Sequence, residues 1–188
     1  LSYHAFAFAG YMPKLNTVNP EVKDYLLKVA TYWIEEFDID AWRLDVANEI
    51  DHQFWRDFRK AVLAKKPDLY ILGEIWHSSQ PWLNGDEFHA VMNYPLSESI
   101  KDYFLREHKE TQRFIWEINS QSMYYRQQIS EVMFNLLDSH DTERIMTTAK
   151  GDLQSVKSAL AFLYLQRGTP CIYYGTELAL IGGPDPDC

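Results

Sequence analysis

Residues 40–50 read DAWRLDVANEI, which has the apolar composition of a buried strand but contains a close pair of opposite charges. Arg43 and Asp45 stand two positions apart, and side chains alternate along a strand, so both fall on one face. An unpaired charge in apolar surroundings is costly. The stretch therefore predicts a strand over 41–46 that carries an arginine–carboxylate pair towards its end.

The chain around this stretch alternates between helical periodicity and short apolar runs. Asn19 precedes Pro20 and Glu21, a pattern typical of a helix N-terminus. Apolar residues then recur at helical spacing as far as Phe37. Further helices are expected at 54–62, 97–129 (one or two) and 156–164, and further strands at 69–73, 89–92, 132–137 and 169–174. Short buried strands separated by helices predict an α/β fold with a parallel sheet.

The composition is that of a globular protein. Of the 188 residues, 46% are hydrophobic and 15% aromatic, which is enough for one sizeable core. The net charge of −9 argues against a nucleic-acid partner, because nothing would neutralise the phosphates. No apolar run approaches the roughly 20 residues that a membrane span needs, and no secretory signal is visible. Cys171 and Cys188 lack metal-ligand spacing, so neither a disulfide framework nor a zinc site is expected.

Three carboxylates each follow a predicted strand. Asp45 ends the first strand, Glu74 follows the second in YILGEIW, and Asp141 follows the fourth in FNLLDSHD. Functional groups of parallel α/β proteins collect at the carboxyl ends of strands. A parallel sheet curled into a barrel would bring all three acids to one rim.

Each acid also has a purely structural interpretation. An aspartate after a strand is often the N-cap of the next helix, and in SHDTER Asp141 could be a capping residue beside a structural His140. Arg43 argues for a paired site at Asp45, and Gly73 and Trp76 argue for close backbone approach and an aromatic wall at Glu74. Three acids at equivalent positions of one chain favour a shared site.

Carboxylates that face one another suit glycoside hydrolysis. An ionised aspartate attacks the anomeric carbon, and a glutamate protonates the leaving oxygen. In a retaining enzyme this pair stands about 5–5.5 Å apart. Arg43 would keep Asp45 ionised, as a nucleophile requires.

The motifs together resemble a known family. WRLDVANE (42–49), GEIW (73–76), LLDSHDTER (136–144) and GTPCIYYGTEL (168–178) resemble the α-amylase family of glycoside hydrolases, whose catalytic domain is a (β/α)8 barrel. MPKLN (12–16) is similar to the motif of the neopullulanase, cyclomaltodextrinase and maltogenic amylase subfamily.

The resemblance implies that this chain is a fragment of the catalytic barrel. A complete barrel needs about 250 residues, and the motifs match roughly strands four to eight. Residues 1–18 would then be the end of the small inserted domain or its loop, and residues 19–188 the C-terminal part of the barrel.

The resemblance also assigns roles. Asp45 matches the nucleophile, Glu74 the general acid/base and Asp141 the transition-state stabiliser. The substrate-binding positions that match are Arg43, Asn48, Glu49, Trp76, His77 and His140, and Tyr173, Tyr174 and Gly175 match the end of the eighth strand. No metal ligand is assigned.

The implied activity is retaining hydrolysis of α-1,4, and in some members α-1,6, glucosidic bonds in cyclodextrins, pullulan or maltooligosaccharides. The alternatives are an oligo-1,6-glucosidase or a glucanotransferase of the same family, or a non-catalytic amylase-like domain that has lost its acids. The three matching acids argue against the last.

The remaining expectations concern binding partners, cofactor and cellular location. An α-glucan oligosaccharide is the expected partner, with no nucleic acid and no membrane. Two open sheet edges favour pairing with another copy, so we expect self-association, and little or no activity, of the fragment. Calcium is left open as a cofactor of the full-length enzyme, because Asn16 alone cannot form a site. The subfamily and the few cysteines favour a cytoplasmic location.

Overall fold

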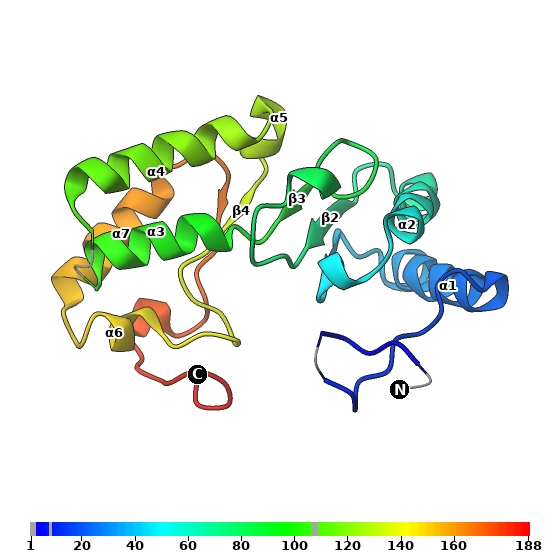
Figure 1. Cartoon of the computed structure of the whole chain (residues 1–188), viewed down its shortest axis with the longest axis horizontal. Coiled ribbons are helices and arrows are strands. Elements are labelled where there is room, and N and C mark those ends of the chain that lie inside the picture. The colour runs from blue at the N-terminus through cyan, green and yellow to red at the C-terminus, as the bar shows by residue number, and fades with distance from the viewer. Residues whose placement is uncertain (1–2, 8, 107–108) are drawn as a thin grey trace. The chain divides into compact units, whose positions relative to one another are not determined.

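The computed structural model describes residues 3–7, 9–106 and 109–188. These form two compact units. Unit 1 holds the residues up to Glu74 together with Pro81–His89, and unit 2 holds Ile75–Gln80 and Ala90–Cys188. Figure 1 labels the elements, and each unit is described by itself.

Unit 1 begins with the expected helix. Helix α1 spans Pro20–Phe37, and the Asn19 side chain accepts the backbone N–H groups of Glu21 and Val22, so the predicted cap is confirmed. The helix ends where Asp38 turns into the left-handed conformation with φ 49°. It packs against α2, His52–Lys65, which is capped by Asp51 (Figure 1).

Two parallel strands lie beside these helices. Strands β1, Ala41–Leu44, and β2, Tyr70–Gly73, pair in register from Ala41 with Tyr70 to Leu44 with Gly73. A Cβ at Gly73 would lie 2.7 Å from the Phe88 ring, which explains why this position has no side chain. The buried core of unit 1 includes Leu44, Trp55, Phe58, Val62, Ile71 and Phe88.

Strand β1 is shorter than the predicted 41–46. Val46 has φ 44° and ψ 44°, a left-handed conformation that ends the extended chain after Leu44. A short 3-10 turn, η1, follows over Ala47–Glu49. Asp45 is therefore the first residue beyond the strand, on the turn.

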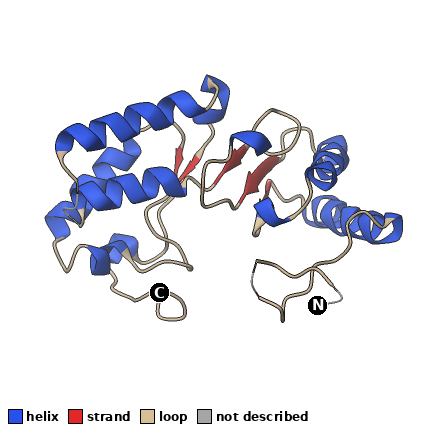
Figure 2. Ribbon diagram, in the orientation of Figure 1, coloured by secondary structure: helices blue, strands red, loops and turns tan. Residues whose placement is uncertain are grey.

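Unit 2 contains one parallel pair of strands and an isolated parallel bridge. Strand β4, Phe134–Asn135, pairs with β5, Thr169–Pro170, and an isolated parallel bridge joins Met92, just after β3 (Ala90–Val91), to Phe134. Strands β3, β4 and β5 are shorter than the predicted strands, because the chain turns into a loop after a few residues of backbone pairing. The parallel direction is as predicted (Figure 2).

Helices lie beside strands β4 and β5 of unit 2 (Figure 2). Among its described residues, the region predicted as one or two helices holds three: α3 Tyr94–Phe104, α4 Thr111–Tyr124 and α5 Gln127–Ser130. The chain continues with α6 Ile145–Thr148, α7 Leu153–Tyr164 and the turn η3 Thr176–Leu178. Helix α3 packs against α4 and α7. The core between them includes Leu96, Ile100, Phe114, Leu137, Ile145 and Leu163.

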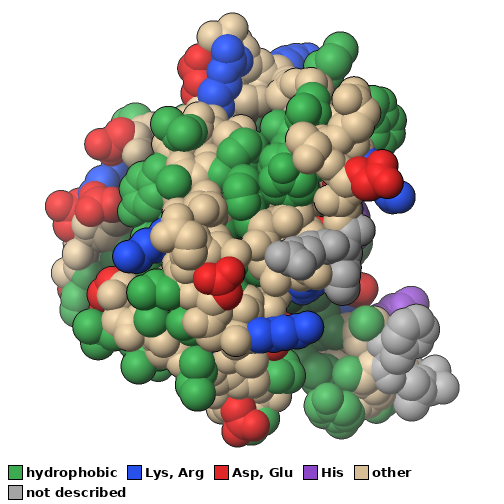
Figure 3. Space-filling view, turned by 90° about the vertical axis from the view of Figure 1, so that its left-hand side faces the viewer, with side chains coloured by type: hydrophobic (Ala, Val, Ile, Leu, Met, Phe, Trp, Pro, Cys, Tyr) green, Lys and Arg blue, Asp and Glu red, His purple; other side chains and the backbone are tan. Residues whose placement is uncertain are grey.

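The surface of this helical side mixes apolar and charged groups. Figure 3 shows hydrophobic side chains gathered between charged ones. On α4, for example, Ile115 and Trp116 are 47% and 67% exposed. In the described part of the chain, no helix combines the length and the apolar character that crossing a membrane requires.

Candidate active site

Unit 1 brings three of the predicted site residues together. Arg43 donates from Nη1 to a carboxylate oxygen of Asp45, and its Nη2 lies 3.1 Å from Oε1 of Glu74. The predicted pairing of Arg43 with Asp45 is therefore present. The Glu74 side chain is 6% exposed and that of Asp45 72%. A guanidinium between two carboxylates offsets their mutual repulsion, so both acids can stay close to one another.

The backbone holds the two acids in a fixed relation. Glu74 donates its N–H to the Leu44 carbonyl at 2.8 Å, and its own carbonyl accepts the N–H of Ala47 at 3.1 Å. Its carboxylate Oε2 accepts the N–H of Val46 at 2.8 Å. Val46 has a positive φ of 44°, which is a strained conformation for a β-branched residue. Such strain persists only where surrounding contacts enforce it. The hydrogen bonds between Glu74 and this turn hold Val46 in the strained conformation, next to Asp45.

Asp141 lies in unit 2, on the loop after β4. Its N–H donates to Oγ of Ser139 at 3.2 Å, and the N–H of Ser139 donates to Oγ1 of Thr142 at 3.0 Å. Nε2 of His140 is 3.2 Å from Oδ2 of Asp141, with 63% and 34% of the two side chains exposed. A polar turn thus presents Asp141 with His140 beside it.

The predicted aromatic wall is also in unit 2. Trp76 is 48% exposed, and its ring stacks on that of Tyr94 with centroids 3.7 Å apart and planes 6° apart. The buried Tyr94 hydroxyl lies 3.5 Å from Oγ of Ser139, the same oxygen that holds the N–H of Asp141. His77 is exposed and contacts the adjacent Ser78 carbonyl with Nδ1. Trp76 and Asp141 are therefore linked through two intervening side chains.

Asn48 and Glu49 lie on the turn η1 just after Asp45. The Glu49 carboxylate accepts from Nζ of Lys14 at 2.5 Å, and Lys14 also donates to the Glu49 carbonyl at 2.8 Å. This hydrogen bond from Lys14 lowers the pKa of Glu49 below its usual value. The predicted substrate position Glu49 thus already has a partner, from the MPKLN segment.

Sequence reasoning missed several residues around Asp141. Asp138 is 4% exposed, and burial raises the pKa of its carboxyl. Arg144 is 3% exposed and donates from Nη1 to the Tyr174 carbonyl at 2.6 Å. A carboxylate at the end of the apolar run FNLLD was the available signal for Asp138, the same signal that identified Asp45.

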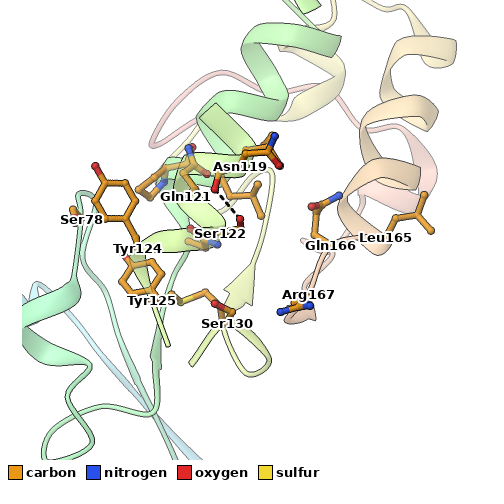
Figure 4. Close-up of a pocket in the computed structure, with 15 residues that line it drawn as sticks. Ser78, Asn119, Gln121, Ser122, Tyr124, Tyr125, Ser130, Leu165, Gln166 and Arg167 are labelled. Carbon is orange, nitrogen blue, oxygen red and sulfur yellow. Dashed lines mark hydrogen bonds between the residues drawn. The ribbon is translucent and has the colours of Figure 1, made fainter. Parts of the chain in front are cut away.

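A separate hollow of about 640 Å³ lies in unit 2. Figure 4 shows Tyr124 and Tyr125 on one side of it and Gln166 and Arg167 on the other. None of the nine predicted site residues lines it. We therefore do not assign the glycosidic chemistry to this hollow.

Metal-binding groups are dispersed. Within residues 3–7, 9–106 and 109–188, no cluster of three or more His, Cys, Asp or Glu side chains could hold a metal ion. No step is assigned to calcium.

The α/β fold and the strand-end carboxylates define the class of protein as an α/β protein with an acidic site. A model of the alpha-amylase catalytic domain matches residues 2–184, so the chain belongs to the alpha-amylase family. That domain is a (β/α)8 barrel, of which this chain has a part.

Particular relatives are close. The chain is 57% identical over 187 residues to the intracellular maltogenic amylase of Bacillus subtilis (strain 168). This alignment covers all of the present chain and 32% of the amylase. A solved cyclomaltodextrinase matches with a TM-score of 0.96 and 55% identity, covering 99% of this chain and 32% of its own.

A third relative is a cyclic α-maltosyl-(1→6)-maltose hydrolase from Arthrobacter globiformis, solved in complex with maltose. It matches with a TM-score of 0.94 and 40% identity, covering 99% of this chain and 42% of its own. The chain spans about a third of the length of the curated relatives it matches.

Proposed function

We propose that the full-length protein is a retaining glycoside hydrolase of α-glucans. It acts on α-1,4, and also α-1,6, glucosidic bonds of cyclodextrins, pullulan or maltooligosaccharides. The observation that carries this proposal is the contact of Arg43 with both Asp45 and Glu74. Family membership and the names of the relatives support it.

In this proposal the reaction is a double displacement. The Asp45 carboxylate attacks the anomeric carbon while Glu74 gives a proton to the departing glycosidic oxygen, which leaves a glucosyl ester on Asp45. Glu74 then takes a proton from water, whose oxygen attacks the same carbon and releases Asp45. The side chain of Asp45 is exposed and that of Glu74 is buried, so the two carboxylates lie in different environments. Different environments suit the separate roles of nucleophile and acid/base.

Asp141 completes the site as the transition-state stabiliser. It lies on the loop after β4, and the carboxyl ends of parallel strands meet at one rim of a barrel. We assign β1 to β5 to barrel strands four to eight, residues 1–18 to the end of the inserted domain, and residues 19–188 to the barrel. We assign sugar binding to Trp76, Asn48, His77 and His140.

Other members of the family remain the nearest alternatives. An oligo-1,6-glucosidase or a glucanotransferase would use the same three acids. The hydrolase from Arthrobacter globiformis is named for a substrate with an α-1,6 bond, which supports α-1,6 cleavage here. We also propose a cytoplasmic location, which is supported by the maltogenic amylase from Bacillus subtilis, a relative whose name calls it intracellular.

Turnover by the full-length protein tests the proposal. We expect β-cyclodextrin, pullulan and maltotriose to be hydrolysed, and Asp45→Asn to lower kcat by at least about 10³-fold because the nucleophile is lost. Asp24→Asn is the matched control, since Asp24 is an exposed aspartate of α1 paired with Lys28. Unchanged turnover by the Asp45 variant would overturn the proposal. The 188-residue chain alone should associate and show little activity.

A further inference from the structure

The buried carboxylate of Asp138 has no part in the reaction described above. Asp138 stands at the end of the apolar run that precedes loop 139–144, which carries Asp141. Its Oδ2 accepts the N–H of Ile145 at 3.0 Å, and its Oδ1 and Oδ2 lie 3.3 and 3.1 Å from the donating hydroxyl of Thr176. One carboxylate therefore bonds to the residue just after the loop and to a second segment.

These bonds close the loop at its base. Asp138 immediately precedes the loop and Ile145 immediately follows it, so the bond between them fixes both ends. Thr176 begins the turn η3 after β5, which anchors the closed loop to the neighbouring strand connection. A loop whose ends are fixed has fewer conformations available to it.

Arg144 supports the same closure from the far end of the loop. Its Nη1 donates to the Tyr174 carbonyl, and its guanidinium lies 4.6 Å from the ring centre of Tyr173 and 5.0 Å from that of Tyr174. Its backbone N–H donates to the Gly182 carbonyl at 3.1 Å. Both ends of the loop are thus held by the segment that follows β5.

The burial of Asp138 is unusual for a simple helix cap. Burying a carboxylate is costly, and burial raises the pKa of Asp138, against the opposing effects of the Ile145 N–H and of the nearby Arg144 and Lys101 charges. Asp152 caps α7 by accepting the backbone N–H groups of Gln154 and Ser155 while remaining exposed. A helix cap would not require a buried carboxylate, whereas a carboxylate that links two buried residues, Ile145 and Thr176, must itself be buried.

We propose that Asp138 is a positioning residue for Asp141. It does not contact the sugar but holds loop 139–144 in the one geometry that aligns the Asp141 carboxylate with the transition state. The inference rests on the proposed role of Asp141. Inside the closed loop, the Ser139 hydroxyl fixes the Asp141 backbone, so a displacement of the loop base would be passed on to the carboxylate.

The test compares variants of the full-length protein with β-cyclodextrin as substrate. Asp138→Ala removes every bond, and we expect kcat to fall about 10–100-fold with KM changed less than about threefold, because misplacement of a group acting in the transition state has effects of this size. Asp138→Asn should stay within about threefold of wild type. Its amide oxygen can accept the Ile145 N–H while its NH₂ donates to the Thr176 hydroxyl.

Two further variants separate positioning from stability. Thr176→Val keeps the shape but loses one bond, and we expect kcat to fall roughly three- to tenfold. Asp152→Ala removes the exposed cap of α7, and we expect kcat to be unchanged when it is measured well below the thermal midpoint. If Asp138→Ala does not fold, Asp138→Asn and Thr176→Val decide the question.

The outcomes distinguish this inference from the proposed function. Full kcat in Asp141→Asn would overturn the role of Asp141 itself. A large loss in Asp141→Asn, together with kcat unchanged in both Asp138→Ala and Thr176→Val, would overturn the positioning role alone. A rise in KM with constant kcat in Thr176→Val would also contradict it, since that pattern indicates uniform loss of substrate binding.

Discussion

The carboxylate of Glu74 accepts the backbone N–H of Val46, the residue that follows Asp45, at 2.8 Å. This bond joins the proposed acid/base directly to the turn that carries the proposed nucleophile. Because Val46 is held in a left-handed conformation, the turn is set by its contacts with Glu74 and not by local preference. The relation between the two acids is therefore built into the backbone of unit 1.

Replacing Glu74 with glutamine tests its role in proton transfer. The amide oxygen can still accept the Val46 N–H, so the turn should keep its shape while the transferable proton is lost. We expect kcat on maltotriose to fall about 10²–10⁴-fold, and much less on an α-maltoside with a 4-nitrophenyl leaving group. Steady-state kinetics on both substrates provide the measurement, and equal losses on the two would argue against an acid/base role.

Arg43→Lys tests whether one guanidinium must serve both carboxylates. A lysine ammonium is a point charge that cannot reproduce the two-sided contact with Asp45 and Glu74. We expect kcat/KM to fall about 10–100-fold. Arg113→Lys is the matched control, because Arg113 pairs with Glu117 on α4 and its side chain is 72% exposed. Similar kinetics for the two variants would contradict a special role of Arg43.

The Lys14–Glu49 pair should stabilise the turn after Asp45. Both side chains are about three-quarters buried, at 21% and 24% exposure, so a double-mutant cycle with Lys14→Met and Glu49→Gln should give a coupling of about 1 kcal/mol in urea unfolding. A coupling near zero would show that the contact is incidental.

The same pair predicts a pH dependence. The pKa of Glu49 is lowered in the folded protein, so its contribution is fully present above the ordinary glutamate pKa. That contribution is lost as the pH falls through the lowered folded value. Measuring the coupling at pH 7 and at progressively lower pH checks this; a coupling that grew on acidification would have the wrong sign.

His89 predicts a second loss of stability on acidification, with a different physical cause. Burial lowers the pKa of His89 to about 4 from its ordinary 6.5, and the neutral ring accepts the Ile71 N–H at Nδ1. Below pH 6.5 the unfolded chain binds a proton that the folded one does not, so stability falls as the pH drops towards 4. Because the ring is partly exposed, the full effect stays below the roughly 3.4 kcal/mol that this pKa difference corresponds to.

His89→Asn checks this dependence, because its side-chain oxygen can accept the Ile71 N–H but does not titrate. We expect the variant to lose less of its free energy of unfolding than wild type between pH 7 and pH 4.5, as measured by urea titrations. Parallel losses in the two proteins would assign the acid sensitivity to other groups.

Local signals in the sequence predicted a good part of this arrangement. The Asn19 cap, the parallel strands and the Arg43–Asp45 pair follow from short-range rules of capping, burial and period-two alternation. Strand lengths were overestimated, since the left-handed turn at Val46 depends on bonds from Glu74, far away in the chain.

Long-range pairings account for the rest. Nothing in the MPKLN segment indicated that Lys14 would engage Glu49. The run ending at Asp138 resembled the run ending at Asp45, yet one aspartate is buried and the other exposed. Only the fold determines which strand-end acid faces solvent and which ties loops together.

The identity of the nucleophile is the central claim, and trapping the covalent intermediate tests it most directly. The full-length protein would be incubated with a 5-fluoro-α-glucosyl fluoride, whose glucosyl ester should hydrolyse slowly, then digested and mapped by mass spectrometry. The account predicts one added fluoroglucosyl group, on the peptide containing Asp45 and on that side chain. A label on Glu74 or Asp141, or no ester while the sugar fluoride is turned over, would contradict it.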